Sequence, residues 1–363
     1  MFTDATYKEK FSQQCDFEDS KELGKKVKKV NDSWKTICKK FPKLPSILPA
    51  VERIIAIGDI HGDFEKLLES LKIANLIPND TTRKTKNVQW LGKETIVVQL
   101  GDQVDSCRYD RSSLKPCSAK GATKDDKGDD VKILRFMTKL HKKATGKGGA
   151  IYSIMGNHEL MNVDGNMDYV SYENIKAFDK EGEEYQEYLN PQKFSSSMEA
   201  RKWAFSPGNP IANFLGCTRQ AGLIIGSNLF VHAGILPHIA DKYKIKDLNS
   251  ILTLYLWKKL NSPDKYSDVL SHGSQSPFWN RSFARANPNQ CENLTKPLLD
   301  TYNVNRLIVG HTPSLNGIST NCGDKVILAD YGSSRAFDKY RMDSESNVQV
   351  LEILNDNIIN ILP

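Results

Sequence analysis

The chain has 363 residues, of which 39% are hydrophobic and 26% charged, and it carries a formal net charge of +6. These values are typical of a globular protein long enough to bury a sizeable core, as one large α/β domain or two smaller ones. No run of about 18 apolar residues is present, and charges occupy the N-terminal stretch where a signal peptide needs apolar residues. We therefore expect a cytoplasmic protein without a transmembrane segment, and the mild basic excess gives little reason to expect a nucleic-acid partner.

Residues 1–50 are predicted to form a helical N-terminal extension, and residues 21–43 within it contain nine lysines. Five apolar residues recur there at the spacings of three and four that mark an amphipathic helix: Val27, Val30, Trp34, Ile37 and Phe41. We interpret this stretch as a surface helix that docks by its apolar stripe and leaves its lysines in water, with a lipid- or nucleic-acid-binding helix as the alternative.

From residue 51 onward, short apolar runs that end at glycines alternate with helical patterns. The first elements are strands at 53–57, 95–100 and 150–155 and helices at about 64–74 and 131–142. A polar surface insertion is predicted at 107–130 and a cap-like insertion, rich in aromatic and polar residues, at 164–220. The later elements are strands at 223–225, 229–232 and 305–309, a helix over about 240–260, and three strands within 325–362. Alternating elements followed by clustered strands predict a mixed α/β fold with two packed sheets flanked by helices, in one domain over 51–363.

Seven cysteines occur without zinc-finger spacing. An odd number in this arrangement favours a reducing compartment and mostly unpaired thiols. Cys107 and Cys117 need separate consideration, because both lie in one polar loop, where they could form a local disulfide or a redox switch. We expect unpaired thiols here as well, with the disulfide as the alternative.

Five predicted strands run into a turn that carries side chains able to bind metal. The segments are GDIHGD at 58–63, GDQVD at 101–105, GNHE at 156–159, VHAG at 231–234 and GHT at 310–312. Because ligands bind outside the carboxyl ends of strands in open α/β sheets, these segments are expected to converge on one crevice. Their carboxylate, imidazole and amide groups suit manganese, iron or zinc, and the lack of thiolates disfavours a structural zinc site.

In this order, the five segments resemble the calcineurin-like metallophosphoesterase superfamily. More narrowly, they are similar to the phosphoprotein phosphatase family and to its Shewanella-like, bacterial-type branch, over roughly residues 52–335. The resemblance implies a four-layer α-β-β-α sandwich with an inserted cap and two divalent metal ions, with manganese expected and iron or zinc as alternatives. Six residues match metal ligands: Asp59 and His61 for the first ion, Asp102 between both, and Asn157, His232 and His311 for the second.

The resemblance also implies the acid–base pair, in which His158 matches the general acid and Asp105 the carboxylate that orients it. These roles agree with elementary chemistry, because two nearby cations activate water for in-line attack on phosphorus and a histidine paired with a carboxylate can protonate the leaving alkoxide. The bridging position needs an anion with two oxygens, which Asp102 provides.

Arginine and amide groups are the candidates for binding the substrate phosphate. Arg281 lies in the segment PFWNR, which is similar to the tryptophan-containing segment whose arginine binds phosphate in the family, and Asn157 is expected to contribute beside its metal role. The family usually has arginine directly after the residue matched by Asp105, whereas Ser106, Cys107 and Arg108 follow here. Arg108 or Arg111 is expected to substitute, or this contact is missing. Tyr331 and Arg335 are further candidates for the pocket, with a packing role as the alternative.

We expect a metal-dependent phosphomonoesterase, most specifically a serine/threonine or tyrosine protein phosphatase, whose substrate is a phosphorylated protein or a small phosphate ester. Two other functions stay open. One is a nucleotide or dinucleoside-polyphosphate hydrolase on the same metal core, with aromatic cap residues that stack on a base. The other is a metal-binding scaffold with little turnover, for which the missing arginine argues and the retained ligands argue against.

Overall fold

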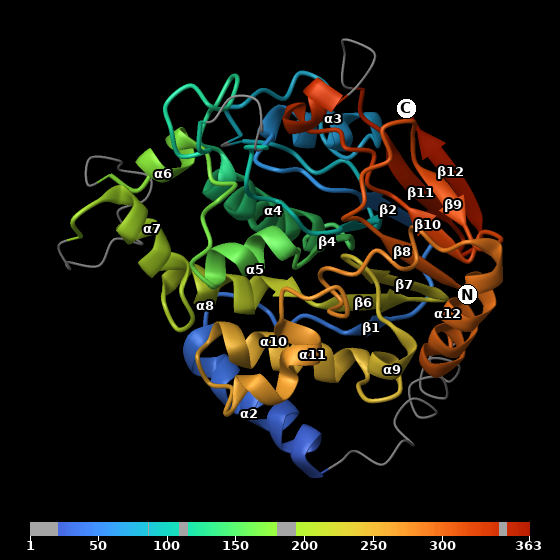
Figure 1. Ribbon diagram of the computed structural model, residues 1–363. Coiled ribbons are helices and arrows are strands. Elements are labelled where there is room, and N and C mark those ends of the chain that lie inside the picture. Colours follow the sequence, from blue (N-terminus) through green and yellow to red (C-terminus); the bar gives the residue numbers. More distant parts are fainter. Residues whose placement is uncertain (1–20, 86, 109–114, 180–193, 341–346) are drawn as a thin grey trace.

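The computed structural model describes residues 21–363, except for 86, 109–114, 180–193 and 341–346. Two six-stranded mixed sheets pack face to face (Figure 1). In the first sheet the strand order is β1 (Ile47–Leu48), β6 (Gly222–Ile225), β7 (Asn228–Val231), β8 (Arg306–Val309), β10 (Val326–Leu328) and β9 (Ser319–Asn321). In the second it is β12 (Ile358–Leu362), β11 (Val350–Leu354), β2 (Arg53–Ile57), β3 (Ile96–Gln99), β4 (Ala150–Ile154) and β5 (Arg219–Gln220).

Strand β2 shows why the central strands are apolar throughout. Ile54 and Ala56 point into the layer between the two sheets, where they meet side chains of β6, β7 and β8. Ile55 and Ile57 point to the opposite face, where they pack against helices. Because neighbouring residues of a strand face opposite sides and both sides are covered, a continuous apolar run is required.

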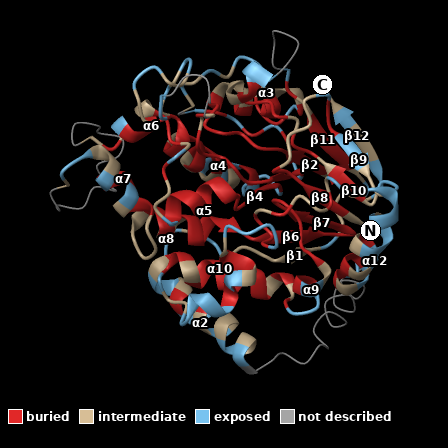
Figure 2. Cartoon of the chain, in the orientation of Figure 1, coloured by how far each residue is buried: buried red, intermediate tan, exposed pale blue. Residues whose placement is uncertain are grey.

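Helices cover the outer face of each sheet, so the fold has four layers in the order α-β-β-α. The second sheet is covered by α3 (Phe64–Ile73) and α4 (Asp130–Thr145). The first is covered by α8 (Pro210–Thr218), α9 (Pro237–Ala240), α10 (Ile245–Leu256) and α12 (Pro288–Tyr302). Shorter helices are α5 (Asn157–Val163), α6 (Tyr172–Lys176), α7 (Ser197–Phe205) and α11 (Ser267–Leu270), with 3₁₀ turns at Pro263–Tyr266 and Arg335–Tyr340. Figure 2 shows the central strands of both sheets buried, whereas the edge strands β9 and β12 are partly exposed. The predicted sandwich is confirmed.

Helix α2 (Lys21–Ile37) packs against α10 by the predicted apolar stripe. Val30 is buried, and the ring of Trp34 lies edge-on to Trp257 with 5.7 Å between centroids. Lysines of the opposite side, including Lys28 and Lys35, are exposed. The interpretation of a docked surface helix is therefore confirmed. Among the described residues, none of the helices combines the length and apolar character needed to cross a bilayer.

Most predicted strands and helices are present, including the helix expected over about 240–260, but the bounds of that helix are wrong. The structure has α9 and α10 instead, separated by residues 241–244. The chain is extended at Lys244 (φ −76°, ψ 162°), and its amide donates to the carboxylate of Asp247 at 3.0 Å, which starts a new helix. The predicted cap-like insertion contains α6, α7 and α8, and its end adds β5 to the second sheet. The domain boundaries at 50/51 and the two insertions stay predictions.

The expectation of mostly unpaired thiols is wrong. All six cysteines in the described part of the chain form disulfides, which are Cys38–Cys217, Cys107–Cys117 and Cys291–Cys322. The spacing of the cysteines in the sequence does not reveal this pairing, because two of the three bonds join cysteines 31 and 179 residues apart. Disulfides persist in oxidising compartments. They therefore remove the cysteine argument for a reducing compartment.

Candidate metal centre and acid–base pair

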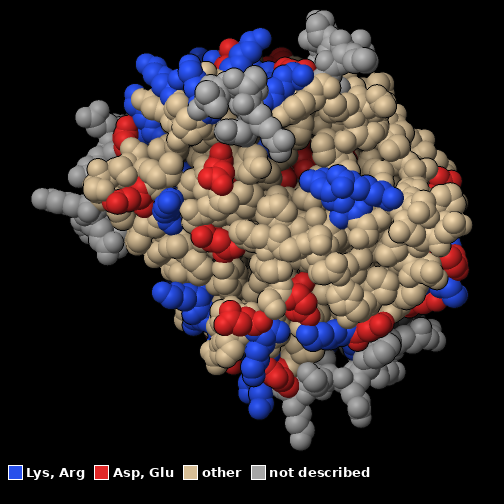
Figure 3. Space-filling model, in the orientation of Figure 1, with Lys and Arg blue, Asp and Glu red and all other residues tan. Residues whose placement is uncertain are grey.

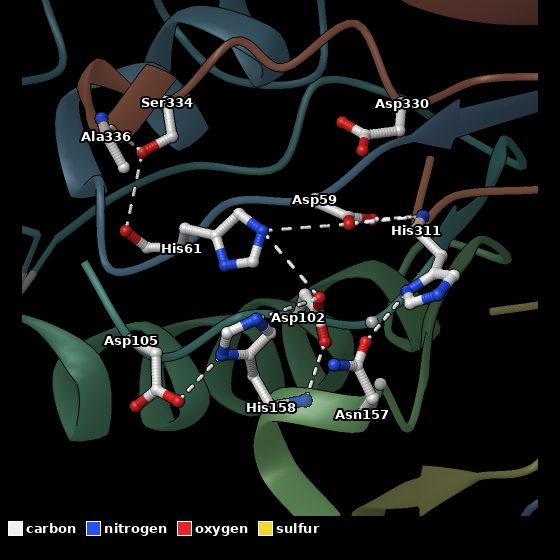
Figure 4. A network of polar contacts seen from close by, with 12 residues as sticks. Asp59, His61, Asp102, Asp105, Asn157, His158, His311, Asp330, Ser334 and Ala336 are labelled. Atoms are coloured by element: carbon white, nitrogen blue, oxygen red, sulfur yellow. Dashed lines mark hydrogen bonds and ion pairs between the residues drawn. The ribbon is translucent and has the colours of Figure 1, made fainter. Parts of the chain in front are cut away.

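The predicted metal-binding segments lie together at one edge of the two sheets. Strands β2, β3 and β4 run parallel, as do β7 and β8, so the loops that follow them meet at their carboxyl ends. Figure 4 shows the side chains from four of these loops pointing toward one another. The six predicted metal ligands are all buried within this cluster: Asp59, His61, Asp102, Asn157, His232 and His311.

The backbone at these strand ends is unusual, because several functional residues are left-handed. His61, Asp102, Asp105 and His311 have φ values of 44°, 51°, 71° and 66°. Non-glycine residues rarely adopt this conformation, and such strain gathers at functional sites. Gly156 permits the close approach of two loops, since a Cβ there would lie 2.2 Å from the amide nitrogen of Asp102. The turns therefore aim side chains inward at a conformational cost.

Backbone carbonyls set the tautomer of the three candidate histidine ligands. His232 Nδ1 lies 2.7 Å from the Leu100 carbonyl, His61 Nδ1 lies 3.3 Å from that of Val104, and His311 Nε2 lies 3.1 Å from that of Trp279. Each of these nitrogens must donate its proton to the carbonyl, which leaves the other ring nitrogen with its lone pair. The three lone pairs point into the cluster, as metal ligands require.

Acceptor atoms crowd together at the second candidate metal position. The side-chain oxygen of Asn157 lies 2.9 Å from His232 Nε2 and 2.9 Å from His311 Nδ1. With the tautomers set as above, all three atoms offer lone pairs and none offers a proton. Such an arrangement is repulsive unless a cation lies among the three atoms. The donor set therefore fits a divalent metal ion.

Asp102 lies between the two candidate metal positions. One of its carboxylate oxygens is 3.7 Å from His61 Nε2 and the other is 3.4 Å from His232 Nε2. Asp59 is 3.7 Å from His61 Nε2 on the first side. Donor atoms within 4.8 Å of one another form two groups that share Asp102, one with His61 and His158 and one with His232 and His311. This is the geometry that a carboxylate bridging two ions requires.

Burial and charge shift the pKa values of the candidate ligands, downward for the imidazoles and upward for Asp59. Burial lowers the pKa of His61 and His232, and burial with repulsion from His232 lowers the pKa of His311 to about 2. Burial, with repulsion from Asp330 and Asp102, raises the pKa of Asp59 well above its usual value. The imidazoles are therefore already in the neutral form that binds metal. A cation bound beside Asp59 would stabilise the ionised form of its carboxylate.

His158 and Asp105 form a buried pair beside this cluster. His158 Nδ1 lies 2.8 Å from the Asp105 carboxylate, which leaves Nε2 facing the centre at 3.9 Å from Asp102. The second oxygen of Asp105 accepts a hydrogen bond from the Asn162 amide at 2.9 Å. Arg201, fully buried, donates to the Asn162 oxygen at 2.8 and 3.0 Å. The pair predicted from sequence is thus supported by two residues that sequence reasoning missed.

Both predicted arginines lie at the site. Arg281 donates to the carbonyl of His311 at 2.7 Å and to the Thr312 hydroxyl at 3.0 Å, which fixes its guanidinium beside a candidate ligand. Arg108 donates to the carbonyls of Asp105 and Cys107 and lies over the ring of Phe337. Burial lowers the pKa of Arg108, and the carboxylates of Asp102 and Asp105 counteract this shift. Arg111 lies outside the described residues.

Asp330 and Glu159 also belong to the site, although no role was predicted for either. Asp330 is buried near Asp59 (Figure 4), and one of its oxygens has no hydrogen-bond partner. Burial, with repulsion from Asp102, raises its pKa to about 6. Asp330 lies directly before Tyr331, and of the segment 329–335 only Tyr331 and Arg335 were predicted to line the pocket.

Arg335 forms ion pairs with Asp63 and Glu65, and Tyr331 packs on the core between the sheets. Glu159 accepts hydrogen bonds from four backbone amides and fixes the β3 loop to α5.

Comparisons with known proteins agree with this geometry. Residues 52–315 match the calcineurin-like phosphoesterase family. The chain is 30% identical to Shewanella-like protein phosphatase 2 of Arabidopsis thaliana, over 86% of this chain and 77% of that protein. It is 29% identical to Shewanella-like protein phosphatase 1 of Plasmodium berghei, over 78% and 67%. A cold-active protein tyrosine phosphatase of a psychrophilic Shewanella has a similar fold, with a TM-score of 0.60 at 21% identity over 88% of this chain and 83% of that chain.

The family match covers both sheets' metal-binding loops and extends over well more than half of the chain. The predicted resemblance is confirmed, and so is the prediction of a phosphoesterase enzyme. The chain belongs to the calcineurin-like phosphoesterase family and is a metallophosphoesterase.

Proposed function

We propose that the protein is a phosphomonoesterase that removes phosphate from phosphorylated serine, threonine or tyrosine side chains of proteins. One observation carries this proposal: a histidine held by a carboxylate, His158 with Asp105, faces two groups of metal-binding atoms that share Asp102. A proton donor and two adjacent cation positions are what hydrolysis of a phosphate monoester needs. The names of the relatives from Arabidopsis and Plasmodium support a protein substrate.

Six residues would hold the two divalent cations. Asp59 and His61 belong to one position, Asn157, His232 and His311 to the other, and Asp102 to both, with manganese proposed and iron or zinc as alternatives. Bound there, the cations would supply charge neutralisation and a water that is nucleophilic at neutral pH.

The protein's own residues would handle the leaving group. Asp105 accepts the Nδ1 proton of His158 and stabilises the imidazolium, which keeps a proton on Nε2. This proton passes to the alkoxide as the phosphorus–oxygen bond breaks. Water attacks in line, and no covalent bond to the protein forms.

Two arginines and an amide would bind the phosphoryl oxygens. Arg281 and Arg108 lie on different loops around the cluster, and each still has N–H groups beyond those that bind backbone carbonyls. Asn157 directs its oxygen to the imidazoles, so its NH₂ group is the part that would contact phosphate. Charge-assisted hydrogen bonds of this kind are about twice as strong as neutral ones.

The proposal can be tested with purified protein and added manganese. The substrates are p-nitrophenyl phosphate, its bis-ester, phosphopeptides and diadenosine tetraphosphate. His158→Ala and Asp102→Ala test the proposed roles, and His238→Ala, at an exposed histidine, is the matched control. We expect hydrolysis of the monoester and phosphopeptides by the wild type and the control, and its loss in the two site variants.

Preference for diadenosine tetraphosphate would replace the proposal with a nucleotide hydrolase. Two bound metals without turnover on any substrate would replace it with a scaffold. Full activity of His158→Ala would refute the acid role.

A further inference from the structure

Two cavities adjoin beside the metal centre. One, of about 450 Å³, is lined by His61 and Arg108 at the centre and by the loop that includes Lys124 and Lys127. The other, of about 680 Å³, lies between α4 and α6. Lys127 lines both, so the two cavities meet at this residue. Their volumes are those of cavities that bind ligands.

The second cavity is strongly basic. Six cationic side chains line it, against three carboxylates: Arg83, Lys127, Lys132, Arg135, Lys139 and Lys176 against Asp129, Glu173 and Asp179. Figure 3 shows lysine and arginine side chains gathered at the upper left of the view, near α6. We call the two adjoining cavities the basic groove.

Part of this charge is already neutralised within the protein. Arg83 pairs with Asp129 at 2.7 Å and with Glu65 at 2.6 Å, and Lys132 lies 3.6 Å from Asp129. Asp129 is therefore already paired and does not neutralise the other basic side chains of the groove. They also show that Arg83 and Lys132 serve the protein's own structure.

Three lysines are left to meet a ligand. Lys127, Lys139 and Lys176 are exposed, and no carboxylate of the described residues lies within ion-pairing distance of any of them. The nearby carboxylate of Asp126 accepts hydrogen bonds from the Ser171 hydroxyl and the Glu173 amide at 2.8 Å each, which fix its orientation. The first cavity carries carboxylates as well, from Asp63, Asp125, Asp126 and Asp338, so the excess of positive charge begins at Lys127 and continues to Lys139 and Lys176 between α4 and α6.

The lining of the groove favours a peptide over a nucleic acid. Stacking on exposed aromatic rings is the usual way to hold single-stranded nucleic acids. Among the described lining residues of both cavities, Phe136 is the only phenylalanine, tyrosine or tryptophan, and it is buried. The acidic side chains of a peptide, by contrast, can bind by ion pairs with the lysines alone.

We infer that the basic groove selects phosphoprotein substrates in which acidic or additional phosphorylated residues flank the phosphorylated residue. This inference rests on the proposed function. The phosphate to be cleaved lies at the metal centre, and the flanking segment follows the groove past Lys127 to Lys139 and Lys176. Charges at the rim of a binding surface act mainly on affinity and association rate, so the preference is expected in KM.

The test compares phosphopeptides of one length that share the phosphorylated residue. Their flanks carry glutamates on the N-terminal side, glutamates on the C-terminal side, or neutral residues. The variant is Lys127→Ala/Lys139→Ala/Lys176→Ala, and the matched control is Lys35→Ala/Lys39→Ala/Lys40→Ala, at three exposed lysines of and after α2. Hydrolysis of p-nitrophenyl phosphate, which is too small to reach from the candidate metal centre to Lys139 and Lys176, monitors the centre itself.

One exposed ion pair changes a binding constant by about two- to threefold, so three together give about tenfold. We expect the wild type to prefer one acidic peptide by about tenfold in kcat/KM at low salt, with less preference as salt screens the charges. The groove variant is expected to lose this preference and to hydrolyse p-nitrophenyl phosphate normally. The control variant is expected to keep both.

Equal kcat/KM values for acidic and neutral peptides in the wild type would overturn the inference, as would a preference that survives in the groove variant. Stronger inhibition by single-stranded RNA than by polyglutamate of equal charge would make the groove a nucleic-acid site instead.

If p-nitrophenyl phosphate is not hydrolysed at all, the proposed function fails on its own. Fluorescence anisotropy of a labelled polyglutamate peptide then measures whether the groove binds acidic peptides. Binding that is weakened about tenfold in the groove variant supports it, and unchanged or absent binding refutes it.

Discussion

Replacement of Arg201 by methionine tests how the acid–base pair is supported. Arg201 lies on α7 within the predicted cap-like insertion, and its side chain is fully buried. It donates to the Asp130 carboxylate at 2.7 Å, to the Asn162 oxygen, and to the Asn174 carbonyl at 3.1 Å. Methionine preserves the contact with the neighbouring phenylalanine rings but removes all of these donors. Arg201→Met therefore leaves a buried carboxylate unpaired and frees Asn162, the partner of Asp105.

The size of the effect follows from the unpaired carboxylate. Breaking a buried ion pair by removing one partner costs about 3–5 kcal/mol of unfolding free energy. Burial raises the pKa of Asp130 to about 7 even with the arginine in place. In the variant the carboxyl group can therefore take up a proton, which avoids part of the cost of an unpaired buried charge. We therefore expect the lower end, about 3 kcal/mol, and a melting temperature lower by about 4 °C in a chain of this length.

The loss should depend on pH. An acid whose folded-state pKa exceeds its unfolded value binds more protons when folded, so its contribution to stability falls as pH rises between the two values. Removal of Arg201 raises the pKa of Asp130 further above about 7. At pH 5.5 Asp130 is protonated in both proteins, whereas at pH 8.5 only the wild type stabilises its ionised form. The deficit of the variant is therefore expected to be larger at pH 8.5.

Thermal unfolding monitored by circular dichroism at both pH values measures the effect, and kcat on p-nitrophenyl phosphate reports on the pair. We expect kcat to fall about tenfold with little change in KM, because Asp105 is held less firmly. The double variant Arg201→Met/Asp130→Asn removes the unpaired charge and should recover more than half of the lost stability. A melting temperature within 2 °C of the wild type, or a double variant less stable than the single one, would refute the reasoning.

Three further predictions concern the metal centre, the acid and a disulfide. Asp105→Asn removes the carboxylate that orients His158, so kcat is expected to fall about 10²–10⁴-fold while metal content by mass spectrometry is unchanged; a decrease below threefold would contradict this. Asp102→Asn removes the shared anion, so fewer than two metal ions per chain should remain after gel filtration, and full retention would count against a bridging role. Cys38→Ala/Cys217→Ala opens a link between residues 179 apart, which costs about 5 kcal/mol by chain entropy; a urea titration that shows less than 1 kcal/mol would disprove it.

The sequence alone was sufficient for the sandwich and for most of the metal centre. Buried central strands must be apolar on both faces, so runs such as 53–57 are visible without a structure. The turns that follow them carry the candidate metal-binding groups within a few residues of one another, as in Asp59 and His61. Both signals are local in the chain, and for this reason periodicity and short motifs reveal them.

Tertiary structure alone decided the features that depend on distant partners. The support of Asp105 by Asn162 and Arg201, the buried Asp330 and the disulfide from Cys38 to Cys217 each join segments far apart in sequence. The same is true of the basic groove, whose lysines belong to a loop, α4 and α6. An isolated arginine, cysteine or lysine gives no local sign of its partner. Only the packing of the layers determines whether that side chain is paired, buried or left to meet a ligand.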